Sequence, residues 1–153
     1  LLIDTELWSP AAGEPLAHAR LELCALDLQS RRIRKASTVG VSDDIPCEEP
    51  LPELSFTRFP KGDPIPLETV KVRSTNLDYC SHTNNIEYLR FILNTYQAEQ
   101  FMEHEIEQVE IHYGNQTFED DEIAISKHSD GQIEYFLLRA RDTSAVDCMI
   151  VWH

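Results

Sequence analysis

Several features that would assign the chain to a large class of proteins are missing from its sequence. No apolar run approaches the ~18 residues of a membrane-spanning helix. The glycine-rich patterns that bind dinucleotides or nucleotide phosphates are absent. Basic residues are scarce, since 13 Lys and Arg stand against 27 Asp and Glu, for a formal charge of −14. That balance argues against general nucleic-acid binding, which requires basic patches that replace phosphate counterions.

Cysteine and histidine are not arranged in the spacings of a metal centre. The four cysteines show no C-x-x-C spacing, and they occur at Cys24, Cys47, Cys80 and Cys148. The segment from Glu103 to His112 contains Glu and His but no H-x-x-x-H pair. No basic segment followed by an apolar core marks a signal peptide. We therefore expect free thiols in a reducing, cytoplasmic location, with no metal and no other cofactor.

The distribution of proline divides the chain into three parts. Six of the eight prolines fall within residues 42–66, a density that no helix or central strand tolerates. We predict a linker there, anchored by Leu54, Phe56 and Phe59. Residues 1–41 contain two strand-like segments, of which the second ends near Gln29. Because two strands alone are marginally stable in water, these strands need a further packing partner.

Residues 67–153 have a regular pattern that predicts one complete domain. Alternating apolar residues indicate strands at 68–74, 107–113, 121–127, 132–141 and 145–153. The fourth is apolar on both faces in its middle, which predicts a central place in the sheet. A helical pattern at 84–96 has its apolar face at Ile86, Leu89, Ile92, Leu93 and Tyr96. Asn84 followed by Glu87 predicts a capping box, and the whole predicts an α+β fold, with one helix laid on an antiparallel sheet.

The polar stretch before the helix, "NLDYCSHTNN" (Asn76–Asn85), holds the strongest catalytic signal. Its aspartate can orient water or act as a base, and its histidine can transfer a proton near neutral pH. The first amides of a helix carry partial positive charge and can polarise a carbonyl. Cys80 is open to two interpretations. It is either a nucleophile activated by His82, or a small, nearly apolar residue that fills a slot.

This stretch also carries a family resemblance. "VRSTNLDYCSHTNNIEYLRFIL" (Val72–Leu93) resembles the signature V-R-x-x-D-L-D-x-N-x-H-V-N-N-x-x-Y of the acyl-acyl-carrier-protein thioesterases, which is followed after three or four residues by I-L. The two agree at Val72, Arg73, Leu77, Asp78, His82, Asn84, Asn85, Tyr88 and Ile92–Leu93. "VEIHYGNQTFEDDEI" and "LCALDLQSRRIRK" are similar to further segments of that family. The resemblance implies tandem hot-dog folds, each a long central helix wrapped by an antiparallel sheet, with the first present only as its tail, residues 1–41.

The family pattern also implies roles for individual residues. Asp78 and His82 match catalytic positions, while Cys80 replaces an Asn and Gln116 replaces a Glu. The substrate-binding positions would be Arg73, Asn84 and Asn85. For the two asparagines, helix capping is the larger expected role. Because glutamine can hold a water but cannot take its proton, we expect slow catalysis.

The resemblance therefore implies a thioesterase of fatty-acid biosynthesis that releases free fatty acid from acyl carrier protein. Two alternatives stay open: a coenzyme A thioesterase of the same fold, and an acyl- or carrier-binding protein with impaired catalysis. We expect the acidic carrier protein to contact the basic cluster Arg31–Lys35. A homodimer formed through the hot-dog sheet is also expected, whereas neither nucleic acid nor a membrane is an expected partner.

Overall fold

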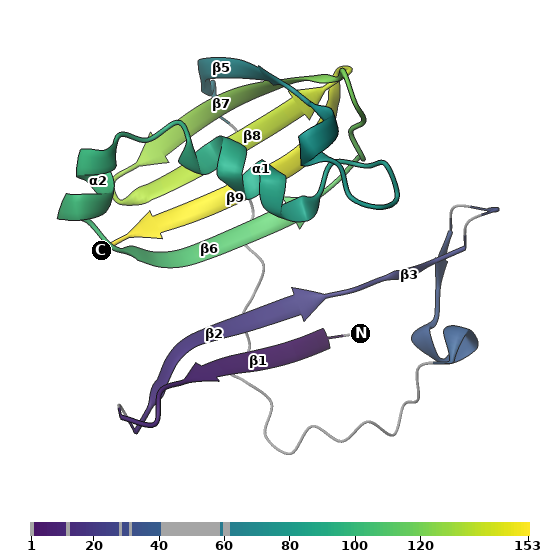
Figure 1. Cartoon of the computed structure of the whole chain (residues 1–153), viewed down its shortest axis with the longest axis horizontal. Coiled ribbons are helices and arrows are strands. Elements are labelled where there is room, and N and C mark those ends of the chain that lie inside the picture. The colour runs from purple at the N-terminus through teal and green to yellow at the C-terminus, as the bar shows by residue number, and fades with distance from the viewer. Residues whose placement is uncertain (1, 12, 28, 31, 41–58, 60–61) are drawn as a thin grey trace. The chain divides into compact units, whose positions relative to one another are not determined.

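The computed structural model describes residues 2–11, 13–27, 29–30, 32–40, 59 and 62–153. The chain forms two compact units, Leu1–Ser55 (unit 1) and Phe56–His153 (unit 2) (Figure 1). In the described part of the chain, no helix has the length and apolarity needed to cross a bilayer.

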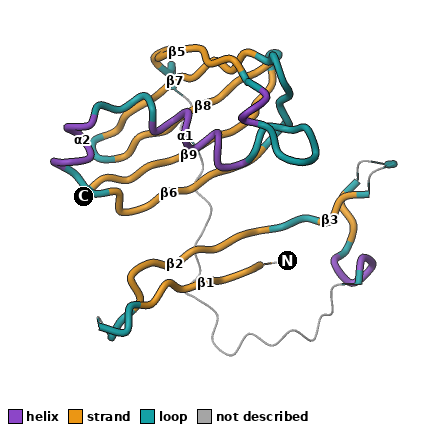
Figure 2. The backbone as a smooth tube through the Cα atoms, viewed as in Figure 1, coloured by secondary structure: helices purple, strands orange, loops and turns teal. Residues whose placement is uncertain are grey.

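Unit 1 consists of two antiparallel hairpins and a short 3-10 helix. β1 (Leu2–Trp8) pairs with β2 (Pro15–Glu22). β3 (Ala25–Leu26) pairs with β4 (Ile33–Arg34), and the 3-10 helix η1 (Ala36–Val39) follows. The second strand predicted from the sequence is therefore divided into β2 and β3 (Figure 2).

Asp27 explains why β3 ends before Gln29. Its Oδ1 accepts a hydrogen bond from Ser30 N at 2.7 Å, and its Oδ2 accepts one from Arg34 Nη2 at 2.6 Å. The hydrogen bonds from Ser30, assisted by Arg34, lower the pKa of Asp27 to about 2. An aspartate that bonds the backbone ahead of it favours a turn over a continuing strand.

Unit 2 is a five-stranded antiparallel sheet with one face covered by helices (Figure 1). In spatial order the strands are β5 (Ile65–Lys71), β7 (Glu122–Asp130), β8 (Ile133–Ala140), β9 (Thr143–Trp152) and β6 (Ile106–Tyr113). The helices are α1 (Asn85–Leu93) and α2 (Ala98–Glu103), and the short 3-10 helix η2 (Ser74–Asn76) follows β5. The five predicted strands and the central place of β8 are confirmed. This is the α+β hot-dog arrangement expected from the sequence.

The core lies between α1 and the sheet. Every second residue of β9 faces it and is buried, as predicted: Val146, Cys148, Ile150 and Trp152. Ile92 of α1 and Phe136 and Leu138 of β8 are 0% exposed, and each such side chain contributes about 1.5–3 kcal/mol by leaving water. Within the described residues, β5 and β6 each pair with one strand only, so the sheet has two open edges. The homodimer expected through this sheet stays a prediction.

The central helix is shorter than predicted. α1 ends at Leu93 instead of Tyr96, and α2 has no counterpart in the sequence-based prediction. Asn and Thr at positions 94 and 95 are weak helix formers, and Thr95 Oγ1 donates to Ile92 O at 2.7 Å. Gln97 is then extended, with ψ of 154°, and starts α2. Two short helices, α1 and α2, therefore replace the single long helix that the sequence predicted.

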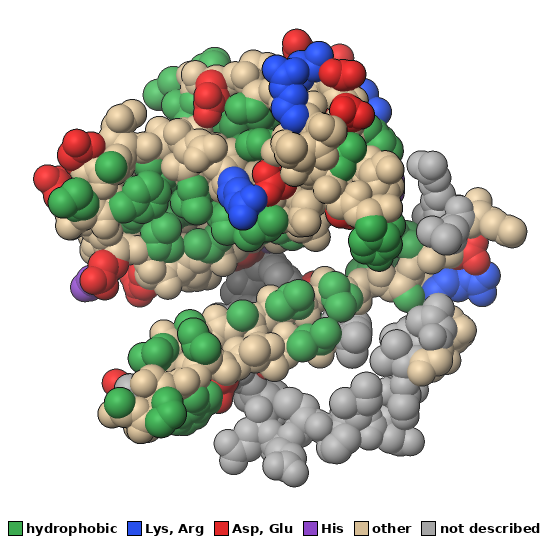
Figure 3. Space-filling view, in the orientation of Figure 1, with side chains coloured by type: hydrophobic (Ala, Val, Ile, Leu, Met, Phe, Trp, Pro, Cys, Tyr) green, Lys and Arg blue, Asp and Glu red, His purple; other side chains and the backbone are tan. Residues whose placement is uncertain are grey.

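The buried face of α1 is also rotated from the predicted face. Ile86 is 47% exposed, whereas Tyr88 and Phe91 are buried beside Ile92. Figure 3 accordingly shows hydrophobic side chains at the surface over the helices of unit 2. A nine-residue helix supports several similar apolar stripes, and only contact with the sheet selects one.

Most of the predicted linker lies outside the described residues, including Leu54 and Phe56. Phe59 is described and packs on the sheet face away from α1. Its ring meets those of His112 and Tyr135 edge-on, at centroid distances of 5.2 Å and 5.6 Å. This contact agrees with the predicted anchoring role of Phe59.

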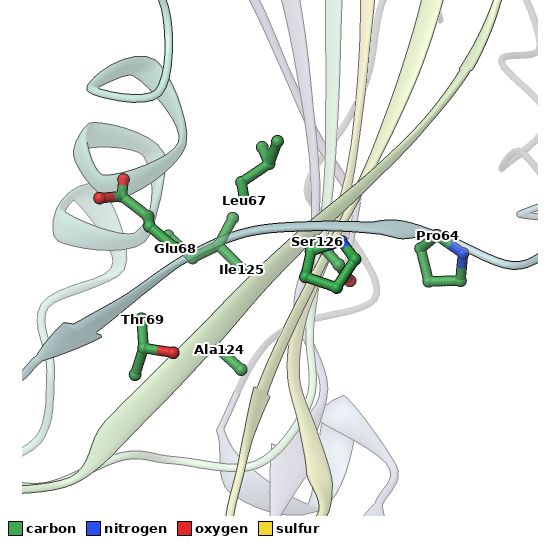
Figure 4. A pocket seen from close by; sticks show the side chains of 8 residues that line it. Pro64, Leu67, Glu68, Thr69, Ala124, Ile125 and Ser126 are labelled. Carbon is green, nitrogen blue, oxygen red and sulfur yellow. The ribbon is translucent and has the colours of Figure 1, made fainter.

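An open groove runs beside the edge strand β5. Ile65 and Pro66 belong to β5 although the sequence assigned them to the linker, since an edge strand tolerates proline. The register with β7 shifts between Pro66 and Glu68, and Leu67 and Thr69 lie on opposite sides of the strand (Figure 4). The groove measures about 470 Å³. Its described lining contains one carboxylate, that of Glu68, and none of the catalytic residues predicted from the sequence.

Candidate active site

The Asp78 side chain closes the loop that precedes α1. Its Oδ1 accepts hydrogen bonds from Cys80 N at 2.8 Å and from His82 N at 3.2 Å. The Asp78 amide donates to His82 O at 2.8 Å, and Ser81 N donates to Asp78 O at 3.0 Å. A short carboxylate bonds nearby amides readily, which explains an aspartate in this tight loop. The second oxygen, Oδ2, has no hydrogen-bond partner among the described residues.

Asn84 caps α1, as predicted. Its Oδ1 accepts from Ile86 N at 3.1 Å, and its carbonyl accepts from Glu87 N at 2.9 Å. The predicted capping box does not form, because the Glu87 carboxylate bonds elsewhere. It accepts from Asn76 Nδ2 at 2.8 Å and from Arg90 Nη1 at 2.5 Å. These two partners also explain how Glu87 can be buried.

A chain of three buried hydroxyl groups, with Thr117 in the middle, joins this loop to the segment between β6 and β7. Thr117 Oγ1 lies 2.6 Å from Thr83 Oγ1 and 2.8 Å from Tyr88 Oη. Thr83 Oγ1 can also donate to Thr117 O at 3.3 Å, and Thr117 N donates to Tyr88 Oη at 3.3 Å. Each hydroxyl can thus donate once and accept once, so the chain is fully satisfied. It fastens the β6–β7 segment against the start of α1.

A small cleft opens between these parts. It measures about 100 Å³ and is lined by four of the predicted site residues, Asp78, His82, Asn85 and Gln116. The rest of the lining consists of Thr83, Tyr88, Tyr113, Gly114, Asn115 and Ala145. Asn85 is the first residue of α1, and no acceptor for its backbone amide is found within the described part of the chain. Asp78 and Gln116, which are 38 positions apart in the sequence, therefore line the same cleft.

Cys80 stands outside the lining of this cleft. It is exposed, and its side-chain hydrogen bond with Tyr79 raises the pKa of the Tyr79 hydroxyl. Tyr79 itself is 98% exposed, so the Cys80 side chain is directed towards solvent. In an extended strand the side chains of Cys80 and His82 would point to the same side, as a nucleophile activated by His82 would need. Ser81 has a φ of 62° instead, and the chain turns between the two residues.

Two other predicted substrate-binding residues of unit 2 also lie outside the lining. Asn84 is occupied as the helix cap. Arg73 is exposed and donates its backbone amide to Asn76 Oδ1 at 2.8 Å. Within the basic cluster Arg31–Lys35, Arg34 forms an ion pair with Asp27 at 2.6 Å, and the first residue lies outside the described part of the chain. Arg73 and Asn84 are therefore not among the residues that line the cleft.

The cleft combines polar groups with aromatic walls. The His82 ring meets the Phe118 ring edge-on, with 5.1 Å between centroids. Burial raises the pKa of Tyr113 above its ordinary value, so its hydroxyl stays protonated at neutral pH and lies 3.4 Å from Asn85 O. Among the described residues, no three His, Cys, Asp or Glu are grouped as metal ligands would be. The cleft thus offers a carboxylate, an imidazole, an amide side chain and neutral donors.

Gly114→Ala should destabilise unit 2 and displace the segment that carries Gln116. A Cβ at position 114 would lie 2.6 Å from Ser144 O, which is too close for any side chain. The backbones cannot separate easily, because Gly114 N donates to Ala145 O at 2.8 Å. We expect the free energy of unfolding, measured by urea denaturation, to fall by about 1–3 kcal/mol.

Gly62→Ala is the matched control. Its added Cβ would meet only the His128 ring, at 3.3 Å, and a side chain can shift where a backbone carbonyl cannot. Equal losses in the two variants would show that the close approach at Gly114 is not the cause.

Sequence reasoning missed several groups of the site. Gly114 did carry a signal, since a glycine directly after a strand often marks a close backbone approach. Thr83 and Thr117 carried none, because the partners are 34 residues apart and each alone resembles an ordinary polar residue. The contact of Arg141, which donates to Gln116 O at 2.8 Å, was likewise not predictable from the sequence.

Comparisons with known proteins agree with this geometry. Residues 65–152 match the family described as the acyl-ACP thioesterase C-terminal domain. The structure is similar to that of an acyl-ACP thioesterase from Bacteroides thetaiotaomicron, with a TM-score of 0.74 and 18% identity over 84% of this chain and 53% of that one. It is also similar to a 12:0-ACP thioesterase from Umbellularia californica, with a TM-score of 0.63 and 17% identity over 84% and 52% of the two chains. No curated protein matches the chain.

These two structures support the hot-dog fold, and this chain spans about half the length of each. The family match covers more than half of the 153 residues. It includes the whole sheet, both helices and every residue that lines the cleft. The chain therefore belongs to the acyl-ACP thioesterase family.

Proposed function

We propose that the cleft hydrolyses the thioester between a fatty acyl chain and acyl carrier protein, releasing the free fatty acid. The observation that carries this proposal is the convergence of Asp78, His82 and the unbonded Asn85 amide in one cleft. Membership of the acyl-ACP thioesterase family supports the carrier protein as the substrate's carrier.

The reaction requires an activated water and a donor for the oxygen that becomes negative. The thioester carbonyl oxygen accepts from the Asn85 amide, at the positive end of α1. Asp78 Oδ2 holds a water and takes its proton as the water oxygen attacks the carbonyl carbon. The tetrahedral intermediate then expels the thiol sulfur, and His82 supplies the proton that the sulfur needs. In this scheme Gln116 holds the attacking water without taking its proton.

A panel of acyl chain lengths, each attached to carrier protein and to coenzyme A, tests the proposal. We expect higher kcat/KM on the carrier protein for the preferred chain length. Higher kcat/KM on coenzyme A would instead support a coenzyme A thioesterase. Tight acyl binding with no turnover on either carrier would support a binding protein with impaired catalysis, which Gln116 in place of a carboxylate specifically favours.

Cys80 should carry no acyl group during turnover. Cys80 is exposed and is not among the residues that line the cleft, so hydrolysis within the cleft needs no acyl group on its thiol. Mass spectrometry after a rapid quench should find the Cys80 peptide unmodified, and Cys80→Ser should retain activity. Cys24 is also exposed and serves as the control for chemical thioester exchange. Acylation of Cys80 well above that of Cys24 would establish it as the nucleophile.

A further inference from the structure

Arg141 reaches the wall of the cleft from the turn between β8 and β9. Ala140 and Thr143 pair across this turn, so Arg141 and Asp142 form a two-residue loop. Both have positive φ, 50° and 59°, as tight hairpin turns of this kind require. The turn brings the Arg141 side chain onto the segment that connects β6 to β7.

The guanidinium makes three contacts within that segment. Its Nη2 donates to Gln116 O at 2.8 Å and lies 3.2 Å from Asp121 Oδ2. Its Cζ lies 5.2 Å from the centre of the Phe118 ring. Asp121 Oδ2 also accepts from Phe118 N at 2.8 Å. Arg141 therefore binds both ends of the short stretch that begins at Gln116.

The stretch held by Arg141 forms one side of the cleft. Gln116 lines the cleft directly, and the Phe118 ring is the edge-on neighbour of the His82 imidazole at 5.1 Å. A shift of Phe118 would therefore free the His82 ring to rotate. On its inner side the same stretch is held by Thr117, through the buried hydroxyl chain. Its far end is also held by backbone hydrogen bonds with Val72 and by the ion pair of Asp120 with Lys71. Among these contacts in the described residues, the one to Gln116 O comes from Arg141.

We infer that Arg141 is a positioning residue that sets the orientation of Gln116 and, through Phe118, of His82. For its catalytic effect this inference rests on the proposed thioesterase function. The planar fork of arginine can bond a carbonyl and a carboxylate while it stacks on a ring. A lysine ammonium has no flat face and cannot make all three contacts at once.

The contacts of Arg141 predict that removing its side chain lowers activity much more than stability. The Arg141 side chain is 55% exposed, and exposed ion pairs contribute little to stability. Small misplacements of catalytic groups, in contrast, can lower rates about 100-fold. Arg141→Ala should therefore lower kcat by roughly 10- to 100-fold, with little change in Tm and in KM. Arg141→Lys should recover only part of the loss, although both variants keep a Cβ and hence the same turn.

Lys71→Gln is the matched control. Lys71 forms an exposed ion pair with Asp120 of the same segment at 2.8 Å. Lys71 is not among the groups that contact Gln116 or Phe118 in the described structure, so this variant should keep the wild-type kcat. Equal effects of Lys71→Gln and Arg141→Ala would overturn the inference, because a general loss of charge would then explain both.

The resonances of the His82 imidazole provide a readout that does not depend on catalysis. Assigned with a His82→Gln variant, they should shift in Arg141→Ala and stay unchanged in Lys71→Gln. Unchanged resonances in Arg141→Ala would overturn the inference. If the wild-type chain hydrolysed no thioester, the proposed function would fail, but this spectroscopic comparison would still decide the positioning role.

Discussion

Replacing Asp78 with asparagine should lower kcat for thioester hydrolysis by roughly 10²- to 10⁴-fold and leave the loop folded. The asparagine Oδ1 can accept the same two amide hydrogen bonds, from Cys80 and His82, that Asp78 Oδ1 accepts. The variant loses only the negative charge and the capacity to take a proton. Steady-state hydrolysis of the preferred acyl substrate, together with thermal unfolding, measures both parts of the expectation.

Asp78→Ala separates the chemical role from the structural one. It removes the proton acceptor and both loop hydrogen bonds, so we expect the same loss of kcat together with a lower Tm. Wild-type kcat in Asp78→Asn would show that Asp78 only shapes the loop. In that case the only role of the Asp78 carboxylate would be to form the turn.

Gln116→Glu should raise kcat by about 10- to 100-fold, because it adds a proton acceptor to the wall of the cleft. Gln116 lines the cleft, and its backbone contact with Arg141 involves only the main-chain carbonyl. The substitution therefore keeps the segment fastened and changes the side chain alone. The gain should disappear as the pH falls towards the ordinary glutamate pKa of about 4.3, where the new carboxylate takes up a proton.

Gln116→Met is the control for the length of the side chain. Methionine is of similar size and cannot hold a water firmly, so we expect its kcat to fall below that of the wild type. A kcat in Gln116→Glu that is equal to or lower than the wild-type value, in a folded protein, would remove Gln116 from the mechanism.

The sheet was predictable from the sequence because its strands carry their own pattern. Val146, Cys148 and Ile150 alternate with less buried positions, and a strand can bury alternate residues only on one face. The helix was less predictable. The helix ends where the Thr95 hydroxyl bonds the backbone carbonyl of Ile92. Its buried face, with Tyr88 and Phe91, is selected by contact with the sheet. Periodicity in nine residues is too short a signal to choose between neighbouring faces.

In the site, too, some features were predictable from the sequence and others were not. Asp78, His82 and Asn85 lie within one short loop, so their closeness follows from the chain itself. Gln116 could be assigned only through the family resemblance, and the structure brings it to the same cleft. For Cys80 the sequence was compatible with an extended backbone that would place its thiol on the same side as His82. The positive φ of Ser81 turns the thiol away from the cleft, and no pattern of residue types specifies that angle.

By itself the sequence determined the α+β class of residues 67–153 and the polar loop before α1, because both are visible in patterns of residues that are close in the chain. The hot-dog fold followed from the family resemblance. Only the tertiary structure decided which groups complete the cleft. The hydroxyl chain of Thr83, Thr117 and Tyr88 and the hydrogen bond from Arg141 to Gln116 O join segments more than 20 residues apart. Such contacts arise when the sheet folds and brings its turns together, so no local spacing can predict them.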